Sequence, residues 1–286
     1  MKALFVDVGS NSIRSMTVHF AADGCRFSEK TVYTTRLAQG LDQSGALSND
    51  SMRRSLDVLT VLAAQAEREG CPVYGYATSA VRDAANGGAF VRSILTQTGI
   101  PVEVLPPNAE ADLALRGATG GTGALLDIGG GSAQLVSPRV SYSAPCGCVR
   151  AKDQCPNVCA YDEMQRALLP WLRRTFAPPP FSEACWTGVG GTITTLAAFD
   201  LRLDRYDARA VASHTLTEAS VLRAYDAILS LGSARRSHPL LSARHDVILP
   251  GAAVLLHILR HCGIPALRVS DADGLEGYAL RHFSQC

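Results

Sequence analysis

Two short segments of the chain match each other without a gap. FVDVGSNS at residues 5–12 aligns with LLDIGGGS at residues 125–132, so that Asp7, Gly9 and Ser12 correspond to Asp127, Gly129 and Ser132. The second copy lies 120 residues after the first, which is close to half of the 286-residue chain and too long for a solenoid repeat. The match predicts a duplicated domain, with one copy over residues 1–120 and the other over residues 121–286.

Each copy of the repeat carries an Asp from an apolar strand into a turn of small residues. Small side chains let backbone N–H groups converge on an oxyanion, and an Asp at a strand end can hold a divalent cation. We therefore expect Asp7 and Asp127 to contact a metal ion, directly or through water. The expected phosphate-binding residues of the two turns are Gly9, Ser10, Asn11 and Ser12 in the first copy and Gly129, Gly130, Gly131 and Ser132 in the second.

The rest of the chain alternates between helix and strand patterns. In the first half we expect helices over residues 49–70, 88–98 and 108–116, with strands at 73–77 and 102–105. In the second half we expect helices over 162–176, 193–199, 217–231 and 246–262, strands at 133–136 and 267–270, and a final helix from about residue 273. This order is typical of an α/β fold. A third glycine-rich turn, GVGGT at residues 188–192, opens one of these helices, and Gly190, Gly191 and Thr192 are further candidates for anion binding.

Composition excludes several classes of protein. The chain is 47% hydrophobic and 19% charged, with a net charge of +1, which argues against a disordered chain and against a nucleic-acid coat protein. No signal-peptide pattern opens the chain and no apolar run reaches the length of a membrane span. We therefore expect a cytoplasmic protein without nucleic-acid or membrane partners.

Seven segments, in order, resemble the exopolyphosphatase and guanosine pentaphosphatase (Ppx/GppA) phosphatase family. They are DVGSNSIR (7–14), ATSAVRDAAN (77–86), EA (110–111), DIGGGS (127–132), GCVR (147–150), GVGGT (188–192) and DVILPG (246–251). The resemblance implies an actin-like fold of two ribonuclease-H-like domains with a cleft between them. It also implies a Mg²⁺- or Mn²⁺-dependent hydrolase that releases terminal phosphate from inorganic polyphosphate or guanosine pentaphosphate, and a homodimer.

The resemblance also assigns roles to single residues. Glu110 matches the family's catalytic glutamate and would orient or deprotonate the attacking water. From the sequence alone, an acidic residue in a first helical turn can equally serve only to complement the helix dipole. Arg82 and Arg14 would act as cationic clamps on phosphate.

Three departures from the family pattern affect the expected site. Gln134 stands where the family has a glutamate, and a neutral amide should bind a divalent metal more weakly than a carboxylate. Asp112 replaces an arginine near Glu110, and a further arginine is missing between Ser270 and Gly277. Gln134 and Asp112 favour a rival interpretation, in which the protein senses guanosine penta- or tetraphosphate without turnover. The intact Glu110 and the two loops oppose it.

The sequence also leaves two alternatives for the reaction, hydrolysis or phosphoryl transfer to an acceptor, and two for the length of a polyphosphate substrate. A phosphotransferase of the same fold would use the turn at Gly188–Thr192 for a nucleotide. The near-neutral charge and the lack of concentrated basic runs favour a short polyphosphate over a long one.

Four cysteines lie within fourteen residues, at Cys146, Cys148, Cys155 and Cys159. Four thiolates can bind Zn²⁺, but this spacing lacks the paired CxxC of a zinc ribbon. A chain without an export signal favours reduced thiols, so we expect ordinary cysteines rather than a structural metal or a redox pair.

Overall fold

The computed structural model describes residues 1–21, 24–157, 159–212 and 214–283 of the chain. It consists of two compact units. Unit 1 contains residues Met1–Gly117 together with Gly274–Cys286, and unit 2 contains Ala118–Asp273. No helix in these described ranges combines the length and the apolar character that a membrane span requires.

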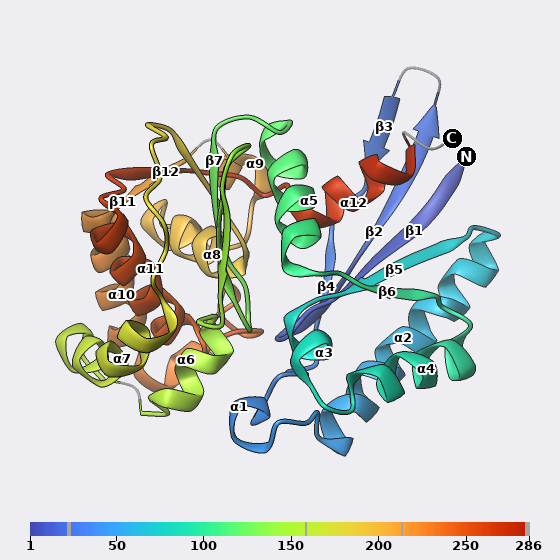
Figure 1. Ribbon diagram of the computed structural model, residues 1–286, viewed down its shortest axis with the longest axis horizontal. Helices are drawn as coiled ribbons and strands as arrows, with labels where there is room; N and C mark the ends of the chain where they lie inside the picture. Colours follow the sequence, from blue (N-terminus) through green and yellow to red (C-terminus); the bar gives the residue numbers. More distant parts are fainter. Residues whose placement is uncertain (22–23, 158, 213, 284–286) are drawn as a thin grey trace. The chain divides into compact units, whose positions relative to one another are not determined.

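Unit 1 is built on a mixed sheet with the strand order β3-β2-β1-β5-β6, and β4 also pairs with β2 (Figure 1). Its strands are β1 (Lys2–Val8), β2 (Ser12–Ala21), β3 (Gly24–Phe27), β4 (Thr31–Thr34), β5 (Val73–Ala77) and β6 (Val102–Val104). β1, β5 and β6 are parallel, whereas β1 and β2 form an antiparallel hairpin. The carboxyl ends of the three parallel strands therefore meet at one edge of the sheet.

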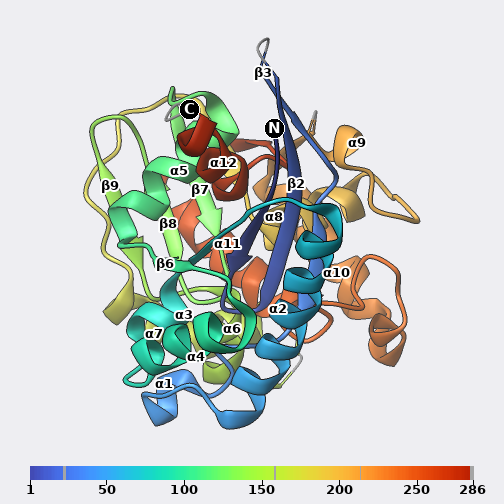
Figure 2. The same ribbon diagram turned by 90° about the vertical axis from the view of Figure 1, so that its right-hand side faces the viewer.

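The helices of unit 1 pack on both faces of this sheet. They are α1 (Leu41–Ser44), α2 (Asn49–Glu69), α3 (Ser79–Asp83), α4 (Gly87–Thr98), α5 (Pro107–Thr119) and α12 (Gly274–Phe283). α2 begins after Ser48, whose side chain accepts a hydrogen bond from the Ser51 N–H, and ends at Gly70 in the left-handed region. α2 packs along α4, and α12 packs on β1, β2 and β3 (Figure 2). Phe5 of β1, Leu113 of α5 and Tyr278 of α12 share one buried cluster.

Unit 2 repeats the same plan. Its sheet has the order β11-β12-β10-β7-β8-β9, with β7, β10 and β12 parallel and β7–β8–β9 antiparallel. The strands are β7 (Ala124–Ile128), β8 (Ala133–Val136), β9 (Ser141–Ala144), β10 (Trp186–Val189), β11 (Thr215–Thr217) and β12 (Ala266–Val269). The hairpin β7–β8 corresponds to β1–β2, so the duplication inferred from the repeat is confirmed in the topology.

The helices of unit 2 surround a larger apolar core. They are α6 (Cys148–Gln154), α7 (Tyr161–Thr175), α8 (Gly191–Asp200), α9 (Ala208–Ala212), α10 (Glu218–Ser230) and α11 (Ile248–Cys262), with a 3₁₀ turn at Gly232–Arg236. α11 is buried along most of its length and packs against α6, α7, α8 and α10. This arrangement fixes α6 and α8, whose N-terminal ends adjoin the glycine-rich turns.

Unit 2 begins at Ala118, three residues before the expected boundary, and a second difference lies at the end of the chain. The repeat predicts that residues 121–286 form the second domain, but α12 belongs to unit 1. The physical reason is burial, because Leu275, Tyr278 and Ala279 of α12 complete the apolar cluster around Phe5. The sequence around residue 273 predicts the helix, and its apolar pattern does not say which sheet it covers.

Candidate active site

The first loop of the repeat closes as a tight turn between β1 and β2. The Gly9 N–H donates to the Ser12 carbonyl at 3.1 Å, and a Cβ at Gly9 would lie 2.9 Å from that oxygen. The Ser10 and Ser79 hydroxyls are hydrogen-bonded at 2.9 Å, and the Asn11 carbonyl accepts from the backbone N–H groups of residues 35 and 36. The loop is therefore held rigidly beside α3, which carries Arg82.

Asp7 and Arg14 bind each other in the first hairpin, although the sequence predicts that Asp7 contacts a metal ion and that Arg14 binds phosphate. Arg14 lies opposite Asp7 in the β1–β2 register, and its Nε and Nη2 both donate to Asp7 Oδ2, at 2.9 and 2.5 Å. Asp7 is only 5% exposed. The guanidinium offsets the charge of this buried carboxylate, which reduces the attraction that Asp7 would offer a metal ion.

Arg82 and Glu110 are 28 residues apart and form an ion pair. Arg82 Nη1 donates to Glu110 Oε2 at 2.9 Å and to the Leu105 carbonyl at 2.8 Å. Glu110 lies in the first turn of α5, which begins at Pro107 rather than at Asn108 as expected, and its side chain is 16% exposed. The pair holds the carboxylate in one orientation while leaving part of it accessible.

These residues of unit 1 share one edge of the sheet. Asp7 lies near the end of β1, α3 with Arg82 follows β5, and Glu110 follows β6. The carboxyl ends of parallel strands are where α/β proteins commonly bind ligands. Asp112, in contrast, pairs with Arg116 at 2.8 Å across one turn of α5, and both side chains are mostly exposed. Asp112, which replaces the family's arginine, therefore forms an ion pair on the surface of α5.

The second loop repeats the turn and gains support from α6. The Gly129 N–H donates to the Ser132 carbonyl at 3.0 Å, as Gly9 does to Ser12. The N–H groups of Cys148 and Val149, in the first turn of α6, donate to the Gly129 and Gly130 carbonyls at 3.0 and 2.8 Å. These two hydrogen bonds fix the turn against the N-terminus of α6.

The third glycine turn comes close to the aspartate of the second loop. Gly190 has φ of +90°, and a Cβ there would lie 2.6 Å from Asp127 Oδ1. Gly191 opens α8, and the Arg244 guanidinium lies directly over it, since a Cβ at Gly191 would be 1.7 Å from Nη1. The adjacent Thr192 is buried. Sequence reasoning missed Arg244, whose only signal is its position two residues before the DVILPG segment.

Gln134 lies next to Asp127 in the β7–β8 register and is 1% exposed. Neither its amide oxygen nor its amide nitrogen has a hydrogen-bond partner among the residues that the structure describes. An unsatisfied buried polar group costs about 1–3 kcal/mol, so this amide is an unusual feature of a folded core.

The oxygen donors near the second loop suit a loosely held Mg²⁺. In the described ranges, no three His, Cys, Asp or Glu side chains gather into a metal-binding group. Mg²⁺ commonly binds through one or two carboxylates and keeps several waters, with substrate phosphates completing its shell. The Asp127 carboxylate and the Gln134 amide oxygen fit such a site, although with little negative charge.

The cysteines of the 146–159 segment are spread over a strand end, a helix and a turn. Cys146 and Cys148 are buried, and burial raises the pKa of the Cys146 thiol to about 12. Burial also raises the pKa of Cys148 and Cys159. A structural metal needs thiolates, and the described residues contain no cluster of three candidate ligands, so a metal at these cysteines gains no support.

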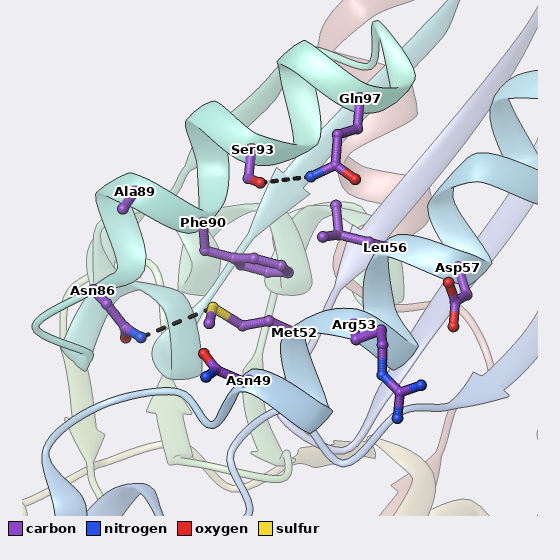
Figure 3. Close-up of a pocket in the computed structure, with 10 residues that line it drawn as sticks. All are labelled: Asn49, Met52, Arg53, Leu56, Asp57, Asn86, Ala89, Phe90, Ser93 and Gln97. Carbon is purple, nitrogen blue, oxygen red and sulfur yellow. Dashed lines mark hydrogen bonds between the residues drawn. The ribbon is translucent and has the colours of Figure 1, made fainter.

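A separate groove of about 360 Å³ lies between α2 and α4 of unit 1 (Figure 3). Phe90, Met52 and Leu56 line it together with polar side chains, and Gln97 Nε2 donates to Ser93 Oγ at its rim. None of the residues expected in the active site lines this groove.

The chain is similar to known proteins over most of its length. The Ppx/GppA phosphatase family model matches residues 24–284. Exopolyphosphatase 2 of Mycobacterium tuberculosis is 31% identical over 311 residues, which cover 96% of each chain. A guanosine-5'-triphosphate,3'-diphosphate pyrophosphatase of Vibrio cholerae is 34% identical over 139 residues, covering 46% of this chain and 28% of that protein.

Structural comparison extends over nearly the whole chain. The crystal structure of an exopolyphosphatase-like protein superposes with a TM-score of 0.87 and 25% identity, covering 99% of this chain and 98% of that one. The two mixed sheets have the actin-like ATPase fold. The chain belongs to the Ppx/GppA phosphatase family.

Proposed function

We propose that the protein is a hydrolase of phosphoanhydride bonds that releases terminal phosphate from inorganic polyphosphate or guanosine pentaphosphate. The observation that carries the proposal is the Arg82–Glu110 pair, in which a partly exposed carboxylate is fixed near the carboxyl ends of the parallel strands β1, β5 and β6. The name of the full-length relative, an exopolyphosphatase, supports the substrate class, and the partial match to a guanosine pyrophosphatase supports the nucleotide as substrate.

The residues are suited to the demands of phosphoryl transfer. This reaction asks a protein mainly to position the reactants, to neutralise charge and to orient a water molecule. In unit 2, the turn at Gly129–Ser132 would donate backbone N–H groups to phosphate oxygens, with Gly190, Gly191 and Thr192 adjoining it. In unit 1, Glu110 would accept a proton from the attacking water, and Arg82 would keep its carboxylate oriented.

A divalent cation, Mg²⁺ or Mn²⁺, is part of the proposal. Asp127 would hold it, with Gln134 contributing an amide oxygen or contacting its water. When bound, such an ion neutralises phosphate charge in the transition state. Asp7 is a weaker candidate because Arg14 already binds its carboxylate.

We further infer that short substrates are preferred. A chain with a net charge of +1 lacks the excess positive charge needed to hold a long polyanion along its surface. Comparable turnover of tripolyphosphate and of polyphosphate with hundreds of units would contradict this inference.

The decisive experiment compares wild type with Glu110→Gln. Phosphate release is measured with Mg²⁺ or Mn²⁺ from tripolyphosphate, long polyphosphate, guanosine pentaphosphate and ATP. The amide of the variant can still accept from Arg82 but cannot take a proton, so we expect a loss of roughly 10²-fold or more in kcat. Glu67→Gln, the same change at an exposed position of α2 in unit 1, should leave kcat unchanged.

Two outcomes would overturn the proposal. Full activity of Glu110→Gln would remove Glu110 from the reaction. If wild type turns over none of the four substrates, the non-catalytic sensor becomes the better interpretation, and Gln134 is the residue that favours it. Phosphate release without any acceptor distinguishes the hydrolase from a phosphotransferase.

A further inference from the structure

Arg14 and Gln134 occupy the same position of the internal repeat. Each lies seven residues after its loop aspartate, and each faces that aspartate in the hairpin register. In unit 1 this position holds a cation bonded to Asp7. In unit 2 it holds a neutral amide that makes no hydrogen bond to Asp127 or to any other residue in the described part of the chain.

Gln134 is 1% exposed, and its neighbours in the strand register are Asp127 of β7 and Ser143 of β9. An apolar side chain of similar size would avoid the cost of two unsatisfied polar atoms. A polar group in such a position therefore points to a partner from outside the chain. An amide offers both a donor and an acceptor, so it can serve a phosphate oxygen through Nε2 and a cation or its water through Oε1.

We propose that Gln134 sets the order in which the divalent cation and the substrate bind. Because the amide adds no negative charge to that of Asp127, the free protein attracts a divalent cation only weakly. The cation enters as a complex with the phosphate substrate, and the Gln134 amide bonds to that complex. This inference rests on the proposed function, since it takes a phosphoanhydride as the substrate.

The first test measures Mn²⁺ binding to the free protein by electron paramagnetic resonance, without substrate and without any assay of activity. The variant Gln134→Glu adds a carboxylate beside Asp127, and we expect it to bind free Mn²⁺ roughly 10–100-fold more tightly than wild type. Gln165→Glu makes the same change on α7, outside the glycine-rich turns, and should bind like wild type. Equal affinities of wild type and Gln134→Glu would overturn the proposal.

The second test uses Gln134→Met, which removes the amide and retains the volume. We expect its Tm to equal or exceed that of wild type, because an unsatisfied group is lost. Calorimetric affinity for tripolyphosphate in the presence of Mn²⁺ should fall by about tenfold, the loss expected for a bond to a charged ligand. If that affinity is unchanged, the amide meets only water and the proposal fails.

The two variants keep the proposal separate from the proposed function. Both readouts are binding measurements, so they remain informative if no substrate is hydrolysed. If Gln134→Glu does not fold because of its buried charge, Gln134→Met still decides the role of the amide. Tight binding of Mn²⁺ to the free wild-type protein would contradict the proposed order even for an active hydrolase.

Discussion

Asp7 and Arg14 bind each other, so neither is placed as the motif alone predicts. The sequence predicts a metal ligand at Asp7 and a phosphate clamp at Arg14. In the structure, two nitrogens of the Arg14 guanidinium donate to one oxygen of Asp7, a residue that is only 5% exposed. A pair of this kind is costly to break from one side, because the remaining charge stays buried.

Arg14→Ala should therefore destabilise the protein. We expect the free energy of unfolding to fall by about 2–4 kcal/mol, since Asp7 loses its guanidinium while staying buried. Arg116→Ala, which breaks the exposed pair with Asp112 in the same unit, should cost less than about 0.5 kcal/mol. Urea denaturation of both variants checks the prediction. Equal losses of unfolding free energy would mean that Arg14 does not stabilise the buried Asp7 carboxylate.

The buried cysteines have a predictable response to pH. Burial raises the pKa of the Cys146 thiol to about 12, so the thiol stays protonated at pH 8. We expect iodoacetamide at pH 8 to alkylate the exposed Cys185 quickly and Cys146 only after unfolding in urea. Peptide mass spectrometry measures the alkylation of each cysteine. Equal alkylation rates of Cys185 and Cys146 in the folded protein would contradict the burial of Cys146.

At the scale of elements, the sequence predicted what has strong periodicity. The helix expected over 49–70 is α2 at Asn49–Glu69, and the strand expected at 73–77 is β5. Several short strands were missed, among them β3, β4, β9 and β11, because three or four residues carry too few alternating side chains to be recognised. α6 was also missed, since its small and polar residues hide a helix that supports the second loop.

Gly147 tests the support that α6 gives to that loop. A Cβ at this position would lie 2.4 Å from the Gly130 carbonyl oxygen and 2.5 Å from the Ser132 nitrogen, both backbone atoms of the loop. We expect Gly147→Ala to lower stability by about 1–3 kcal/mol and to reduce phosphate release. In Gly88→Ala on α4, the nearest atom is Arg92 Nη1 at 3.7 Å, so activity should be retained. Wild-type turnover by Gly147→Ala would show that the loop position is not critical.

At the scale of the whole molecule, the repeat predicted the two-sheet plan but not the path of the chain. Repeated motifs report on local structure, so the equivalent hairpins and parallel strands could be derived from them. Contacts such as Arg82 with Glu110, or Arg244 over Gly191, join segments far apart in the sequence, and spacing carries no information about them. The packing of α12 in unit 1 likewise depends on contacts with residues far away in the sequence, such as Phe5.

Unit 1 is therefore discontinuous, and its stability should depend on the last helix of the chain. Leu275 of α12 is fully buried in the cluster with Phe5 and Tyr278, so Leu275→Ala should cost about 2–5 kcal/mol. Leu280→Ala, the same change at a half-buried position of α12, should cost at least about 1 kcal/mol less. Hydrogen exchange should report faster exchange in β1 and β5 of unit 1 and little change in β7 and β10 of unit 2. Uniform loss of protection across both sheets would instead indicate that the two units unfold as one.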